Sequence, residues 1–148
     1  MENTEKCDNY FCLEVASRSE NEKFVRNVVA NFVLPLSPTV EEVSDLKTAV
    51  SEAVTNSIVH AYPKSVGKIK VVGGINGNTL TITIEDNGEG IENVEVARQP
   101  FFTTKPFDER SGMGFTVMET FMDSVEVTNK QSEKGLIVVM KKSFGGNN

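Results

Sequence analysis

The sequence predicts an α+β fold, a two-layer sandwich in which helices pack on one face of a mostly antiparallel sheet. Two observations carry this prediction. Apolar residues recur at helical spacing in some segments, and they alternate with polar residues, as in strands, in others. The order is strand, helix, helix, two strands, loop and helix, two strands. The 148 residues are expected to form one domain, with flexible ends over 1–8 and 144–148.

Residues 9–16 open the chain with an alternating segment, which predicts a strand half buried against the core. Residues 20–33 follow with apolar side chains at helical spacing, and Ser17 or Ser19 is expected to cap this helix. Its predicted apolar positions are Phe24, Val25, Val28, Val29 and Phe32.

A long second helix is predicted over residues 40–61. Thr39 and Glu42 have the spacing of a capping box, which would start the helix, and Pro63 would stop it. The second half of the chain contains mostly strand patterns. These predict a hairpin of strands 68–75 and 79–85 turning at Asn76-Gly77-Asn78, a helix over 115–122, and a closing hairpin of strands 124–129 and 136–143.

The charge balance argues against a direct DNA or RNA reader. Fifteen basic residues against twenty-one acidic ones give a net charge of −6, and the basic residues form no stripe. Cys7 and Cys12 do not have a zinc-ligand spacing. The N-terminal segment lacks the pattern of a signal peptide, and no apolar stretch is long enough for a membrane span. We therefore expect a cytoplasmic protein.

The predicted long helix has an apolar face, expected to be core, on which Lys47 is the one misfit. The apolar face comprises Val43, Leu46, Val50, Ala53, Val54, Ser57, Ile58 and Ala61. The opposite side carries Asp45, Thr48, Glu52, Thr55, Asn56 and His60. This polar stripe faces either solvent or a ligand, and the pattern alone leaves both possibilities open. Its chemistry includes a carboxylate that can accept a proton and an amide oxygen suited to a hard cation.

Two pairs of glycines lie farther along the chain. Gly88 and Gly90 follow Asp86 at the end of a predicted strand, where they form a turn or allow a flat ligand to approach the backbone. Gly112 and Gly114 lead into a helix, whose N-terminus favours an anion such as phosphate. A long irregular segment, residues 98–112, connects the two pairs and is a candidate binding loop or lid. The Rossmann, P-loop and EF-hand patterns are not matched.

Three motifs in chain order resemble those of the Bergerat-type ATP-binding fold of the GHKL superfamily: Glu52-x-x-x-Asn56 on a helix, Asp86-x-Gly88-x-Gly90 after a strand, and Gly112-x-Gly114 before a helix. The segments 48–62, 97–106 and 109–123 are similar to the anti-sigma F factors of endospore-forming bacteria, a family of serine kinases within that superfamily. The likeness covers nearly the whole chain.

The resemblance implies a site for ATP or ADP with Mg²⁺. Asp86 would read the adenine amino group, and Asn56 would coordinate the magnesium ion. Glu52 would act on a serine hydroxyl as general base or orienter. The backbone at Gly88 and Gly90 would approach the base, and the remaining nucleotide contacts would come from the lid segment, at Thr104, Lys105, Arg110, Gly112 and Gly114.

The resemblance also implies partners. These are a sporulation sigma factor of the sigma F type, which the protein would inhibit, and an anti-anti-sigma factor, which it would phosphorylate. Arg26 matches a position that the family uses for partner contact, and a homodimer is expected. Leu136 departs from the family pattern, because many relatives have a threonine there.

Two other functions remain open from the sequence. A nucleotide-gated switch would bind the sigma factor without kinase activity, although such a binder has no need of Glu52 as a base. The catalytic part of a sensor histidine kinase would need an acceptor histidine supplied in trans, since His60 is the only histidine in the chain.

Overall fold

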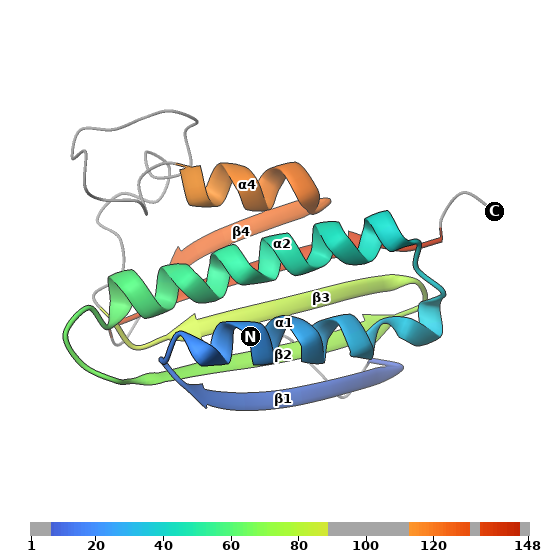
Figure 1. Ribbon diagram of the computed structural model, residues 1–148. Coiled ribbons are helices and arrows are strands. Elements are labelled where there is room, and N and C mark those ends of the chain that lie inside the picture. The colour runs from blue at the N-terminus through green and yellow to red at the C-terminus, as the bar shows by residue number, and fades with distance from the viewer. Residues whose placement is uncertain (1–6, 89–112, 131–133, 146–148) are drawn as a thin grey trace.

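The computed structural model describes residues 7–88, 113–130 and 134–145. Its elements follow the predicted order: β1 Asn9–Ala16, α1 Glu20–Phe32, the 3₁₀ turn η2 Leu34–Leu36, α2 Val40–Asn56, the π-helix η3 Ser57–Ala61, β2 Lys68–Asn76, β3 Thr79–Asp86, α4 Met113–Phe121, β4 Ser124–Asn129 and β5 Leu136–Ser143. The helices α1, α2 and α4 lie on one face of the sheet (Figure 1). The predicted α+β sandwich is thus confirmed.

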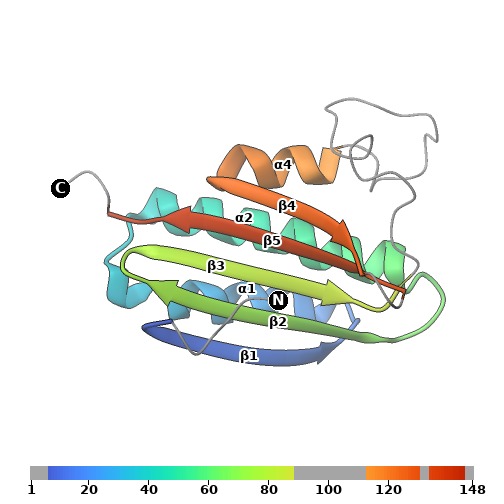
Figure 2. The same ribbon diagram turned by 180° about the vertical axis from the view of Figure 1, so that it is seen from behind.

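The strands of the described residues form one antiparallel sheet in the order β1-β2-β3-β5-β4 (Figure 2). The predicted hairpin joins β2 to β3, with Asn76 opposite Thr79. Gly77 in this turn has a φ of 61°, a left-handed conformation that glycine adopts without a steric penalty. The connection places the end of β3 at the same edge of the molecule as the C-terminal end of α2 (Figure 1).

The core lies between the sheet and the helices. Alternate residues of the strands point into it, as the period of a strand requires. One of the inward-pointing residues of β5 is charged: Lys142 is only 9% exposed. Its Nζ donates a hydrogen bond at 2.9 Å to the carbonyl of Phe121, at the C-terminal end of α4. The apolar members on the three central strands are Ile69, Val71, Ile75, Leu80, Ile82, Ile84, Leu136, Val138 and Met140.

The capping box at the start of α2 is present as predicted. Thr39 Oγ1 accepts from the amide of Glu42 at 3.0 Å, and the amide of Thr39 donates to Glu42 Oε1 at 2.8 Å. This second hydrogen bond is the main cause that lowers the pKa of Glu42 below its ordinary value. The predicted helix over 40–61 remains α-helical to Asn56 and then continues as the π-helix.

Three details differ from the sequence-based expectations. Ser19 occupies the N-cap of α1 without a side-chain capping bond, and Ser17 Oγ instead accepts from the amide of Gly67 at 2.8 Å. Phe24 was assigned to the apolar face of α1, but it is 49% exposed. Phe144 lies in the end expected to be flexible, yet it is buried and its amide donates to the carbonyl of Asn78 at 2.9 Å, so it belongs to the core.

Candidate functional site

The C-terminal end of α2 carries the first predicted motif. Asn56 is its last α-helical residue and is buried, so it is not part of a solvated helix face. Glu52 lies one turn earlier and is half-buried. The chain continues from Asn56 as a π-helix, whose first residue, Ser57, is only 4% exposed. A π-helical turn within a helix is frequently found at functional sites.

Asp86 is the last residue of β3, and its buried carboxylate is bound from several parts of the chain. Ser57 Oγ donates to Oδ2 at 3.1 Å. The amides of Gly88 and Leu136 donate to Oδ1 at 3.0 Å and 3.3 Å. These hydrogen bonds compensate for the loss of hydration, since a carboxylate that is 2% exposed needs such partners. They also join the π-helix η3, β3 and β5 at one point.

Gly88 lies directly against the π-helix. A Cβ atom built on Gly88 would lie 2.4 Å from the Cβ and 2.5 Å from the Cα of Ala61, distances that real side chains essentially never show. This close approach requires glycine. The start of the loop after β3 is therefore held against the continuation of α2, so the segments that carry the first two motifs lie together.

Gly135 supports the same loop from the other side. It has a φ of 136°, and a Cβ atom at this position would lie 2.1 Å from the carbonyl oxygen of Asp86. The following residue, Leu136, has its side chain in the core and contributes its amide to Asp86. The leucine that departs from the family pattern thus retains a backbone contact with the predicted site.

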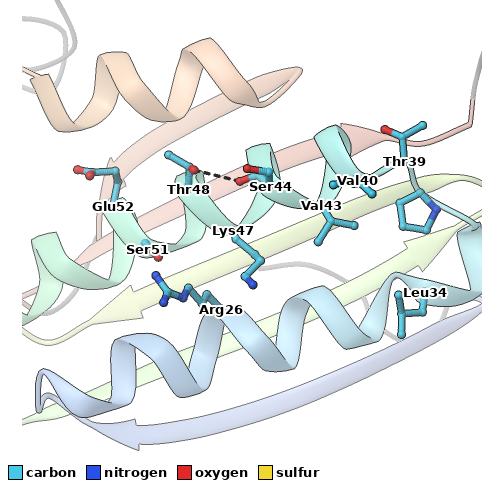
Figure 3. Close-up of a pocket in the computed structure, with 11 residues that line it drawn as sticks. Arg26, Leu34, Thr39, Val40, Val43, Ser44, Lys47, Thr48, Ser51 and Glu52 are labelled. Carbon is cyan, nitrogen blue, oxygen red and sulfur yellow. Dashed lines mark hydrogen bonds between the residues drawn. The ribbon is translucent and has the colours of Figure 1, made fainter.

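Arg26 and Glu52 line one pocket between α1 and α2 (Figure 3). Arg26 is half-buried and pairs with Glu22 at 3.4 Å, one turn earlier on α1. Glu22 also accepts a hydrogen bond from the hydroxyl of Ser51, which connects the two helices. The predicted partner-contact residue and the predicted catalytic carboxylate therefore belong to the same surface. The other lining residues are Leu34, Pro38, Thr39, Val40, Val43, Ser44, Lys47, Thr48 and Ser51.

Of the other predicted site residues, some lie within the described ranges and some lie outside them. Gly114 lies in the first turn of α4. His60 is half-buried within the π-helix. Within residues 7–88, 113–130 and 134–145, no group of three or more His, Cys, Asp or Glu residues could hold a metal ion, and no helix is long and apolar enough to span a membrane. The predicted site residues outside these ranges are Gly90, Thr104, Lys105, Arg110 and Gly112.

Sequence reasoning did not identify Ser57 as a site residue, because it was placed on the apolar face of the helix. Its hydroxyl was nevertheless a signal, since a buried polar group nearly always has a hydrogen-bond partner. Thr83 on β3 and Thr116 on α4 have buried hydroxyls for which the structure shows no hydrogen-bond partner, and neither was predicted to have a role.

Comparisons with solved structures are consistent with this fold. The RsbU and RsbW domains of Rv1364c from Mycobacterium tuberculosis superpose with a TM-score of 0.65 at 14% identity, over 92% of this chain and 32% of that one. The catalytic domain of the histidine kinase ThkA gives a TM-score of 0.58 at 14% identity, over 90% of this chain and 96% of that one. At this identity the likeness supports the fold alone.

Sequence comparisons identify the family. A model of the histidine kinase-like ATPase domain matches residues 15–142. An anti-sigma F factor of Clostridium kluyveri is 54% identical over 137 residues, which cover 93% of this chain and 96% of the relative. One of Clostridium perfringens is also 54% identical, over 93% of this chain and 98% of the relative. The chain therefore belongs to the anti-sigma F factor family, within the histidine kinase-like ATPase domains of the GHKL superfamily.

Proposed function

We propose that this protein is an ATP-dependent protein-serine kinase that phosphorylates an anti-anti-sigma factor and also binds and inhibits a sigma factor of the sigma F type. One observation carries the proposal. The hydrogen bond from Ser57, the first residue after α2, ties the buried carboxylate of Asp86 to the end of the helix that bears Asn56 and Glu52. Three groups are thereby held on one framework: Asp86, suited to the adenine base, Asn56, suited to a metal ion, and Glu52, suited to a substrate hydroxyl.

The chemistry of these residues fits a nucleotide. The carboxylate of Asp86 only accepts hydrogen bonds, so it suits the amino group of adenine. The amide oxygen of Asn56 suits magnesium, which usually takes one or two protein ligands and completes its shell with phosphate oxygens and water. When bound, Mg-ATP supplies the phosphoryl group and neutralises charge on it. We assign phosphate contacts to Thr104, Lys105, Arg110, Gly112 and Gly114, and contacts to the base to Gly88 and Gly90.

Glu52 is the residue that we assign to the substrate serine. Its position one turn from Asn56 is appropriate for a carboxylate that receives or orients the hydroxyl proton while the phosphate is held nearby. It lines the pocket that Arg26 also lines, so a protein partner bound at Arg26 would cover the surface that contains Glu52. The partner contact would thus present the serine to Glu52.

The remaining assignments follow the family. We propose that the protein acts in the cytoplasm as a homodimer and that Arg26 contacts the partner proteins. The alternative is a nucleotide-gated switch that sequesters the sigma factor without transferring phosphate. The presence of a carboxylate at position 52 favours the kinase, because a switch does not need a base.

The decisive experiment is phosphate transfer from Mg-ATP to a candidate anti-anti-sigma protein of the same system, at matched ATP occupancy. We expect transfer by the wild type, loss of at least about a hundred-fold in Glu52→Ala, and no change in Glu41→Ala, an exposed control at the start of the same helix. A wild type that binds ATP and the sigma factor but transfers no phosphate would establish the switch instead.

The partner assignment has its own test. Arg26→Ala is expected to weaken binding of the sigma factor or the anti-anti-sigma factor while ATP binding is kept. Arg18→Ala serves as the matched control, because Arg18 is exposed and does not line the pocket. Equal binding by both variants would remove Arg26 from the partner surface.

A further inference from the structure

Tyr62, the residue that follows the π-helix, is hydrogen-bonded to the loop that begins with Asp86. The amide of Asn87 donates to the Tyr62 hydroxyl oxygen at 2.7 Å, and this hydroxyl donates in turn to the carbonyl of Lys68 at 2.8 Å. One phenol group therefore connects the end of the π-helix η3, the start of β2 and the backbone between Asp86 and Gly88.

The ring of Tyr62 is fixed by its surroundings. It lies where a side chain at position 67 would be, since a Cβ atom on Gly67 would lie 2.1 Å from its Cε1. Gly67 is held by a pair of hydrogen bonds with Ser17, from the amide of Gly67 to Ser17 Oγ at 2.8 Å and from the amide of Ser17 to the carbonyl of Gly67 at 2.9 Å. The hydroxyl of Tyr62 is therefore presented to Asn87 from a well-defined position.

Asp86, Asn87 and Gly88 each contact the segment that follows Asn56. Asp86 is bound by Ser57, Asn87 by Tyr62, and Gly88 lies against Ala61. Lys130 adds a further contact from the region between β4 and β5, because its Nζ donates to Asn87 Oδ1 and pairs with Glu85 at 2.9 Å. Asp86 thus lies in a short segment whose backbone is bonded to Tyr62 and whose neighbouring side chains, Glu85 and Asn87, are bonded to Lys130.

We infer that Tyr62 is a positioning residue for recognition of the purine base: its hydroxyl fixes the Asn87 amide, and through it the loop from which Asp86 would accept the amino group of adenine. This inference rests on the proposed function, because it deepens the assignment of Asp86. It goes beyond that assignment by giving base selectivity to a residue that need not touch the nucleotide.

The test is binding of ATP and of inosine triphosphate, which has an oxygen in place of the adenine amino group, to the full chain and to Tyr62→Phe. The phenylalanine keeps the ring over Gly67 and removes only the hydroxyl. We expect ATP binding to weaken about five-fold, the effect of one hydrogen bond, while binding of inosine triphosphate changes less than about two-fold. The preference for ATP would shrink accordingly.

Tyr10→Phe is the matched control, because Tyr10 is the other tyrosine of the chain and is 55% exposed on β1. This variant should bind both nucleotides as the wild type does. An unchanged ATP preference in Tyr62→Phe, with both affinities either unaltered or lowered equally, would overturn the positioning role. A wild type that binds neither nucleotide would overturn the proposed function itself, and the inference with it.

Discussion

The hydroxyl of Ser57 donates to Oδ2 of Asp86 at 3.1 Å, and both side chains are buried. The two residues are 29 positions apart in the chain, on the π-helix and at the end of β3. The hydroxyl of Ser57 can either donate or accept a hydrogen bond, whereas the carboxylate of Asp86 can only accept one. This difference allows the fold and the function of Asp86 to be separated by substitution.

Asp86→Asn is expected to lower ATP affinity at least about ten-fold. The substitution replaces a carboxylate oxygen, which accepts a hydrogen bond, by an NH₂ group, which would face the amino group of adenine as a second donor. The free energy of unfolding should change by only about 1 kcal/mol, since the Ser57 hydroxyl can reverse and accept from the amide. Nucleotide titration and urea unfolding measure the two quantities. Asp123→Asn is the control, because Asp123 also accepts from a backbone amide, that of Ser143 at 2.7 Å. Unaltered ATP affinity in Asp86→Asn would remove Asp86 from the base site.

Gly88→Ala should destabilise the protein and disturb the loop. The added methyl group would lie within 2.5 Å of the backbone of Ala61, so the loop or the π-helix must move, at a cost of about 1–3 kcal/mol in the free energy of unfolding. Gly77→Asn provides the comparison, because a Cβ there meets nothing within 4 Å and asparagine tolerates a positive φ. By chemical denaturation, the free energy of unfolding of Gly77→Asn should lie within about 0.5 kcal/mol of that of the wild type. Equal stability of the two variants would contradict the close packing.

Lys142→Met is expected to reduce the free energy of unfolding by about 1–3 kcal/mol, because it leaves the carbonyl of Phe121 without this donor at the end of α4. Methionine preserves much of the apolar volume of the lysine chain. Lys141→Met is the neighbouring control, since Lys141 is exposed. Urea denaturation measures the free energy of unfolding of both variants. A similar reduction in both would show that the buried hydrogen bond does not contribute to stability.

The stability supplied by Glu42 should depend on pH. Its pKa is lowered in the folded protein, mainly by the hydrogen bond from the Thr39 amide, so its charge is favoured by folding. The contribution is fully present above the ordinary pKa of 4.5 and is lost as the pH falls through the lower, folded value. Glutamine at this position can still accept the hydrogen bond but does not titrate.

Melting temperatures of the wild type and Glu42→Gln should therefore differ at neutral pH and converge as the pH falls below the ordinary carboxyl pKa and through the lowered one. Glu41→Gln is the control, because Glu41 lies in the same turn but outside the capping box. A difference between wild type and Glu42→Gln that stays constant down to strong acid would disprove the linkage.

The helical core was predictable from sequence because burial itself produces the periodicity. Leu46, Val50, Ala53 and Val54 are all fully or nearly fully buried, as their spacing on α2 indicates. Asn56 falls on the polar stripe of the same pattern but is 7% exposed. A polar residue at the end of a helix can be buried by other parts of the chain, which the periodicity of the helix itself does not reveal.

The site was only partly predictable for a similar reason. Asp86 and Gly88 were identified by residue type and by the resemblance of their motif. Tyr62 carried no such signal, because its role arises from contacts with Lys68 and Asn87 that exist only once the sheet has formed. The π-helix was also invisible, since its apolar residues are compatible with a continued α-helix over so short a distance.

The hydrogen bond from Leu136 to Asp86 has a consequence for biosynthesis. These residues are 50 positions apart, and contacts of such long range form late, after the cost of closing the intervening chain has been met. A growing chain on the ribosome that has emerged only as far as β4 lacks this donor to the buried carboxylate. The set of donors to the Asp86 carboxylate is therefore complete only after β5 has joined the sheet.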